Sequence, residues 1–254
     1  MSRKKRLKVI SNDSLVFSLE EQHSKHKVSI ADLKETFPLT ENQETFFNFY
    51  RKGHHALLLH GVAGTGKTYI ALFNAFQELL QKNSAYKKVV IVRSAVPSRD
   101  IGFLPGSDKE KAEVYVQPYE DICARLFPRF AERAYTKLKE QDLVSFMITS
   151  YVRGLTLENN IVIVDEAQNM TDMELNSIMT RIGNNSKVVF CGDFRQTDLS
   201  KRNDMSGLKK FMGIAHHMPS FRHVEFGIDD IVRSSIVKEY IIARMQYEDM
   251  LVAS

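Results

Sequence analysis

One short stretch of this 254-residue chain limits its fold more than any other, because its glycines and its Lys-Thr pair have the spacing of a phosphate-binding loop. An apolar run at 56–60 precedes the stretch, and a helical pattern over 67–81 follows it. In that context the loop N–H groups and the positive end of the helix converge on one anion. The motif G-x-x-x-x-G-K-[ST] is formed here by Gly61, Val62, Ala63, Gly64, Thr65, Gly66, Lys67 and Thr68.

Two side chains of this loop have specific predicted tasks. Lys67 is expected to reach the β- and γ-phosphates of a nucleotide, and Thr68 to place its hydroxyl on Mg²⁺. ATP and Mg²⁺ are therefore the cofactors that the loop predicts.

The remainder of the chain alternates short apolar runs with helical patterns. The runs lie at 88–93, 144–149, 161–164, 187–191 and 222–226, and the helical patterns at 108–141, 171–182, 206–215 and 229–248, after an aromatic helix capped by Thr40. Uninterrupted apolar strands alternating with helices indicate a parallel sheet covered on both faces. We expect a single α/β domain over 36–254, a mostly parallel sheet with helices on both faces, after a basic, poorly ordered segment at 1–35.

Two carboxylates end the apolar run at 161–164. Asp165 and Glu166 are expected at the edge of the sheet where parallel strands deliver their carboxyl ends. Asp165 is predicted to bind Mg²⁺ through water, and Glu166 to act as general base for an attacking water. A helix-capping role is the alternative for either residue.

A third polar cluster follows the run at 187–191. Gly192 permits a tight turn, after which Asp193 and Gln196 are expected at the same edge of the sheet. The amide of Gln196 is interpreted as a sensor that bonds the γ-phosphate or the attacking water. A polar loop held by Asp turns is the alternative.

Charge and composition add weaker indications. The net charge is +4, and Arg3, Lys4, Lys5, Arg6 and Lys8 open the chain. Such a run either contacts nucleic-acid phosphates or forms a solvated tail without a partner. No apolar stretch reaches the ~18 residues that span a membrane, and the two cysteines indicate buried free thiols. A cytoplasmic protein is the expectation.

Together these segments resemble the PhoH-like ATPase family. The similarity includes 94–106 with Lys109-Glu-Lys, the stretch 151–157 that leads to Asp-Glu-Ala-Gln-Asn, and Asp230-Ile-Val-Arg-Ser, and it covers roughly residues 38–248. The core is also similar to the first motor domain of superfamily-one helicases. The resemblance implies a RecA-like P-loop NTPase domain, RNA or single-stranded DNA as partner, and a ring-shaped homo-oligomer, for example of six subunits.

The resemblance also implies roles for individual residues. Thr40 and Gln43 look like the helicase Q motif, in which the glutamine binds the adenine edge, while a capping box explains the same pair and both roles are compatible. The segment at 95–101 varies among family members, which leaves the nucleic-acid contacts open. The space before residue 38 is too short for the nuclease domain that some relatives carry, so no nuclease activity is predicted.

Arginines outside the loop complete the predicted site. A chain with one motor domain needs an arginine from elsewhere to stabilise charge on the γ-phosphate, and we assign this to Arg233, reaching a neighbouring subunit. An ion pair with Asp229 or Asp230 is the alternative. Nucleic-acid phosphates are assigned to Arg93, Arg99 and Arg153, with surface solvation as the alternative.

The predicted function is therefore ATP hydrolysis coupled to nucleic acid, as in a helicase or translocase. Two other functions remain open: a small-molecule kinase that uses the same loop, and an ATP-binding scaffold or switch without motor activity. Adjacent Asp and Glu followed by Gln on a third strand disfavour the kinase. The joint presence of Lys67, Thr68, Asp165 and Glu166 disfavours the scaffold.

Overall fold

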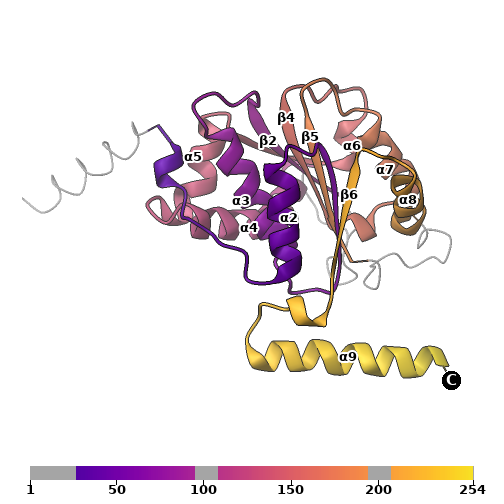
Figure 1. Ribbon diagram of the computed structural model, residues 1–254. Helices are drawn as coiled ribbons and strands as arrows, with labels where there is room; N and C mark the ends of the chain where they lie inside the picture. The colour runs from indigo at the N-terminus through magenta and orange to yellow at the C-terminus, as the bar shows by residue number, and fades with distance from the viewer. Residues whose placement is uncertain (1–26, 95–107, 194–206, 254) are drawn as a thin grey trace, which may run out of the picture.

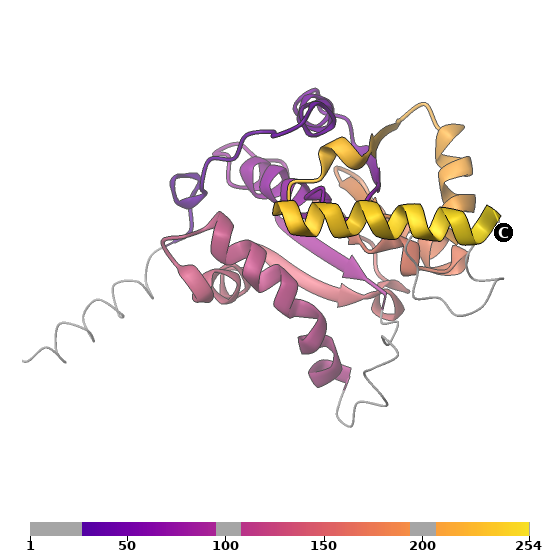
Figure 2. The ribbon, with the colours of Figure 1, turned by 90° about the horizontal axis from the view of Figure 1, so that it is seen from below.

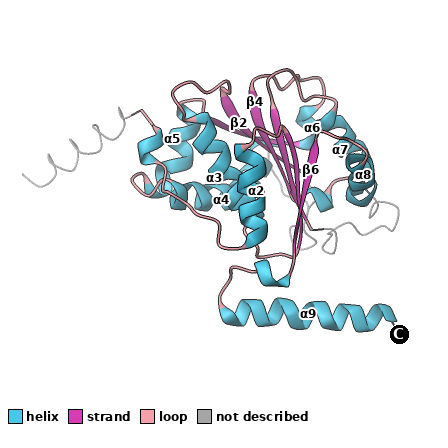
Figure 3. Ribbon diagram, viewed as in Figure 1, coloured by secondary structure: helices cyan, strands magenta, loops and turns pink. Residues whose placement is uncertain are grey.

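A parallel sheet forms the centre of the computed structural model, which describes residues 27–94, 108–193 and 207–253. Six strands run in the order β3-β2-β4-β5-β1-β6, and every pairing is parallel (Figure 3). The sheet confirms the predicted fold class. Its strands are β1 (Ala56–Gly61), β2 (Lys88–Arg93), β3 (Val144–Ile148), β4 (Asn160–Asp165), β5 (Lys187–Gly192) and β6 (Phe221–Phe226).

Helices cover both faces of this sheet (Figure 1). One face carries α2 (Glu41–Arg51), α3 (Lys67–Leu79), α4 (Asp108–Leu126) and α5 (Ala134–Glu140), and the other carries α6 (Thr149–Val152), α7 (Asp172–Met179) and α8 (Gly207–His216). The last helix, α9 (Ser235–Ala253), lies across the edge where the strands end (Figure 2). No helix in the described part of the chain is long and apolar enough to cross a membrane.

The apolar strands divide their side chains between two separate cores. In β1, Leu57 and Leu59 belong to the core under α3, whereas Ala56 and Leu58 belong to the core under α8. Strands β2, β4 and β5 follow the same alternation. Because both faces are covered, nearly every position of a central strand is apolar, which explains the long apolar runs; His60 in β1 and Lys187 in β5 are buried polar exceptions. Cys123 and Cys191 are buried free thiols, as predicted.

Part of the segment that we expected to be poorly ordered is packed against the domain. Residues 1–26 lie outside the described part, but 27–35, which we assigned to a poorly ordered lead-in, pack against the domain. Val28 is buried in the core. Asp32 forms an ion pair with Arg129 at 3.0 Å, and the Lys34 N–H donates a hydrogen bond to Leu126 O at 2.7 Å. Short polar segments of this kind have no periodicity from which such docking could be predicted.

Two of the predicted helices have different bounds in the structure. The pattern at 108–141 contains α4, a 3-10 turn at Ala131–Arg133 and α5. The helix predicted at 229–248 begins only at Ser235, because Asp230 accepts from the Gly227 N–H at 2.8 Å and forms a tight turn instead. The Val232 N–H then donates to Gly64 O at 3.1 Å, which holds this segment against the phosphate loop.

Gly61 is the point at which the loop leaves the sheet. Its φ of +118° is reserved for glycine, and a Cβ atom built here would lie 2.2 Å from Phe226 O at the end of β6. That same oxygen accepts from the Val62 N–H at 2.9 Å. The close approach of β6 therefore needs a residue without a side chain.

Replacing Gly61 with alanine should lower the free energy of unfolding by about 3 kcal/mol or more, because a steric clash adds to backbone strain. Gly53→Ala is the matched control, since Gly53 also has a positive φ of +78° but nothing within 4 Å of its Cβ position. The control should lose only about 1 kcal/mol. Equal losses in urea-unfolding experiments on the two variants would contradict the proposed clash.

Candidate nucleotide-binding site

The phosphate loop joins β1 to α3 in the predicted conformation. Gly64 and Gly66 each have a φ of +78°, and the Thr65 hydroxyl donates to Val62 O at 3.1 Å. Gly66 directly precedes the first residue of α3. The loop therefore winds around the N-terminus of a helix whose unpaired N–H groups attract an anion.

Lys67 is folded into the loop that contains it. Its ammonium group donates to Gly61 O at 2.9 Å and to Val62 O at 2.7 Å, and it lies 5.9 Å from the centroid of the Phe226 ring. Burial lowers the pKa of Lys67, partly opposed by the charge of Asp193. The ammonium also donates to Thr65 Oγ1 at 3.3 Å, so all three of its N–H groups are bound within the loop.

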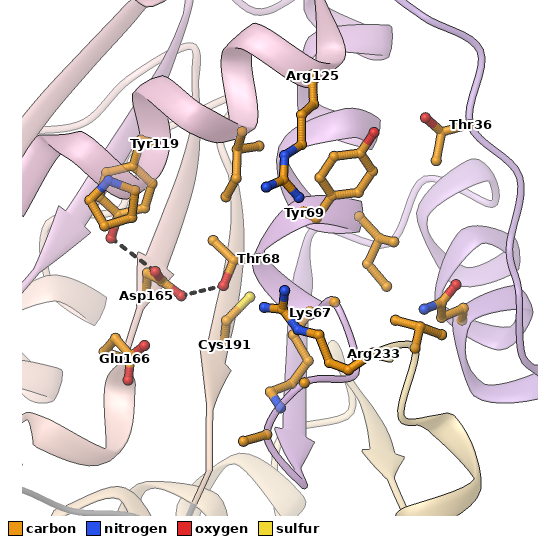
Figure 4. Close-up of a pocket in the computed structure, with 18 of the residues that line it drawn as sticks. Thr36, Lys67, Thr68, Tyr69, Tyr119, Arg125, Asp165, Glu166, Cys191 and Arg233 are labelled. Atoms are coloured by element: carbon orange, nitrogen blue, oxygen red, sulfur yellow. Dashed lines mark hydrogen bonds between the residues drawn. The ribbon is translucent and has the colours of Figure 1, made fainter. Parts of the chain in front are cut away.

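Asp165 ends β4 and meets Thr68 across the site (Figure 4). The Thr68 hydroxyl donates to Asp165 Oδ1 at 2.7 Å, and the Tyr119 hydroxyl donates to Asp165 Oδ2 at 2.9 Å. A hydroxyl that donates its proton keeps lone pairs for a cation. Mg²⁺ prefers oxygen ligands such as hydroxyl and carboxylate groups, so Thr68 and Asp165 fit that ion.

Glu166 adopts a backbone conformation that is rare for its residue type. Its φ of 52° is left-handed, a strain of the kind often found at functional sites. Gln168 donates a hydrogen bond to the Glu166 carboxylate and accepts one from the Asp193 N–H at 3.0 Å, linking β4 to the end of β5. Burial and then the adjacent charge of Asp165 raise the pKa of Glu166.

Gln43 connects the segment before α2 to the phosphate loop. Its side-chain oxygen accepts from the Leu39 N–H at 2.8 Å, and its amide nitrogen donates to Thr65 O at 2.9 Å. Thr40 caps α2 by accepting from the Gln43 N–H at 3.3 Å. Only this half of the expected capping box forms, because the reciprocal bond goes to Leu39. Gln43 keeps one amide proton and lines the cavity, so its predicted contact with adenine stays a prediction.

Arg233 lines the cavity of its own chain. Figure 4 shows its side chain extending over the phosphate loop, and its Cγ lies 3.1 Å from the position of a Cβ on Gly64. Although Asp229 and Asp230 both belong to the described residues, neither forms an ion pair with Arg233. The Arg233 side chain therefore lies at the cavity of the chain that carries it, next to Gly64 of the phosphate loop.

The other predicted arginines lie in different places. Arg93, at the end of β2, lines the same cavity, and its guanidinium lies 5.6 Å from the centroid of the Tyr115 ring. Burial alone would lower the pKa of Arg93. The nearby Tyr119, Glu166 and Asp165 outweigh burial, so the pKa of Arg93 is raised overall. Arg153 is exposed outside the cavity, where it donates to Met173 Sδ at 3.2 Å. Arg99 and Gln196 lie outside the described residues.

The cavity has a volume of about 810 Å³, within the range of small-molecule sites. Beyond the predicted residues, its lining includes Tyr69, Tyr119, Arg125 and Thr36 (Figure 4). Sequence reasoning missed these four because none belongs to a recognisable motif. Tyr119 and Arg125 are on α4, and only the packing of this helix brings them to the site.

The strand, glycine loop and helix, together with the acidic end of β4 in an all-parallel sheet, define a P-loop NTPase. The family model described as PhoH-like protein matches residues 36–245, and the chain belongs to that family. Its membership confirms the resemblance drawn from the motifs.

Similar curated proteins carry the same family name. The chain is 36% identical to a PhoH-like protein of Bacillus subtilis over 72% of its length and 56% of the relative. It is 34% identical to one of Mycobacterium leprae over 74% and 53%, and 32% identical to Protein PhoH of Escherichia coli over 84% and 60%. The chain thus spans little more than half the length of these relatives.

One solved structure with a similar chain path is the large terminase of a thermophilic bacteriophage in complex with ADP. The match covers 80% of this chain and 49% of the terminase chain, with 12% identity and a TM-score of 0.48. Similarity at this level defines neither activity nor ligand.

Proposed function

We propose that this chain binds ATP with Mg²⁺ and hydrolyses it. One observation carries the proposal: Lys67, Thr68, Asp165, Glu166 and Arg233 come from separate segments of the chain and line a single cavity. No role in a stable core requires two adjacent carboxylates and three cationic or hydroxyl groups to face the same space. A triphosphate with its metal ion does require them.

Each residue has a task that fits its position. Lys67 and the N-terminus of α3 would bind the β- and γ-phosphates, and Thr68 and Asp165 would hold the magnesium ion, Asp165 through water. Mg²⁺ would neutralise the phosphate charge that develops during transfer. Glu166 orients and deprotonates the attacking water, and its raised pKa strengthens it as a base. Gln196 is proposed to sense the γ-phosphate, and Thr40 and Gln43 to border the base.

Arg233 is proposed to stabilise the transferring phosphate within its own chain. It reaches the cavity through residues 231–233, which are fixed by the bond between Val232 and Gly64. This assignment replaces the contribution from a neighbouring subunit that the single motor domain suggested. A ring-shaped homo-oligomer remains a proposal that rests on the family resemblance.

We further propose that hydrolysis is coupled to RNA or single-stranded DNA in the cytoplasm. The support is the basic run at 3–8 and the exposed Arg153, which comes directly after α6, the short helix that follows the carboxyl end of β3. Arg99 and Arg93 are proposed to contribute, Arg93 from within the cavity. Contacts to phosphate weaken steeply as salt rises, which gives this part of the proposal its own test.

Glu166→Gln should lower the rate of ATP hydrolysis by at least about 100-fold, because the amide cannot accept the proton of water. Single-stranded RNA or DNA should stimulate the wild-type rate, and the stimulation should fade between about 50 and 200 mM salt. The measurement is phosphate release by the purified protein with Mg²⁺.

Glu132→Gln is the matched control, since Glu132 is an exposed carboxylate outside the cavity. It should hydrolyse ATP at the wild-type rate. Wild-type protein that binds ATP but releases no phosphate under any of these conditions would exclude the hydrolase and favour a switch. Hydrolysis indifferent to nucleic acid would exclude only the coupling.

Arg233→Ala should reduce kcat by about 10³-fold or more, as expected for an arginine that contacts the γ-phosphate. To decide whether Arg233 acts on the ATP site of its own chain or on that of a neighbouring subunit, Arg233→Ala protein is mixed with Lys67→Ala protein. Action within the same chain predicts no recovery of activity in the mixture. Recovery of a substantial fraction would show instead that Arg233 acts on a neighbouring subunit.

A further inference from the structure

The carboxylate of Asp165 is held from two sides by two different helices. Thr68 at the start of α3 donates to Oδ1 at 2.7 Å, and Tyr119 of α4 donates to Oδ2 at 2.9 Å. Two donors on opposite oxygens fix the plane of the carboxylate as well as its position. Figure 4 shows this chain of contacts running from Tyr119 through Asp165 to Thr68.

Tyr119 itself is firmly anchored. Its side chain is fully buried, and its ring centroid lies 5.7 Å from that of Phe146 on β3. A buried hydroxyl needs a partner, and Asp165 supplies it. The residue before it, Pro118, lines the cavity and has no N–H to donate within α4. The buried ring therefore fixes where the Tyr119 hydroxyl lies in the site.

The sheet register explains why this helix serves the site. Arg93 and Asp165 are direct partners at the ends of the adjacent strands β2 and β4. Tyr115 and Tyr119 lie one turn apart on α4, the first 5.6 Å from the Arg93 guanidinium and the second bonded to Asp165. One face of α4 thus contacts both residues where these two strands end.

We propose that Tyr119 is a positioning residue of the magnesium site, whose hydroxyl holds the Asp165 carboxylate in the orientation that receives a magnesium-bound water. The inference rests on the proposed binding of ATP with Mg²⁺. The Thr68 hydroxyl donates its one proton to Asp165 and keeps its lone pairs for the ion, so Tyr119 is the second donor that stops the carboxylate from rotating. Partners that hydrogen-bond to the groups around a bound metal ion affect metal affinity strongly, although they never touch the ion.

The test is Tyr119→Phe, which removes one oxygen and keeps the buried ring. Binding of a fluorescent ADP analogue is measured as a function of Mg²⁺ concentration and also with the metal chelated. The half-saturating Mg²⁺ concentration should rise about tenfold or more, while affinity without metal stays at the wild-type value. The Mg²⁺ dependence of hydrolysis should shift by the same factor.

Tyr135→Phe is the matched control, because Tyr135 is a buried tyrosine of the same core on α5 that does not line the cavity. It should leave the Mg²⁺ dependence unchanged, and thermal unfolding verifies that both variants are folded. An unchanged half-saturating Mg²⁺ concentration in Tyr119→Phe would overturn the inference and leave Tyr119 as a core residue. Failure of the proposed function is distinct, since the wild-type protein would then bind no nucleotide or release no phosphate.

Discussion

The burial of the central strands on both faces is the constraint from which the architecture follows. Strands β2, β4, β5 and β1 lie between two helical layers, so their interiors contain almost only apolar side chains. The polar groups that line the cavity then lie mainly where strands end. Because all strands are parallel, their carboxyl ends meet at one edge, and Arg93, Asp165, Asp193 and the phosphate loop meet there too.

Segments distant in sequence complete this edge. The Val232 N–H bonds to Gly64 O and carries Arg233 over the loop, while Gln43 ties the start of α2 to Thr65. On the far side, Glu174 of α7 accepts hydrogen bonds from Ser94 and Thr149, which follow β2 and β3. The carboxyl edge of the sheet is thus held by contacts from α2, from α7 and from the segment before α9.

Much of this arrangement could be predicted from the residues. The strand limits follow from the apolar runs, and Lys67, Thr68, Asp165 and Glu166 come together because the motif and the parallel topology place them at one edge. The contact of Tyr119 with Asp165 was not predictable, since it depends on the packing of α4 against β3. The reach of Arg233 was not predictable either, because the turn at Asp230 delays α9 and directs residues 231–233 toward the loop of the same chain.

The central claim is that the loop at the carboxyl edge is where a nucleotide binds, and calorimetric titration with Mg-ATP tests it most directly. The account predicts one nucleotide per chain in the wild-type protein. Lys67→Ala should weaken that affinity by at least about tenfold, because a charge-assisted contact to phosphate is lost. Equal affinity in the two proteins, or no binding by the wild type, would contradict the account.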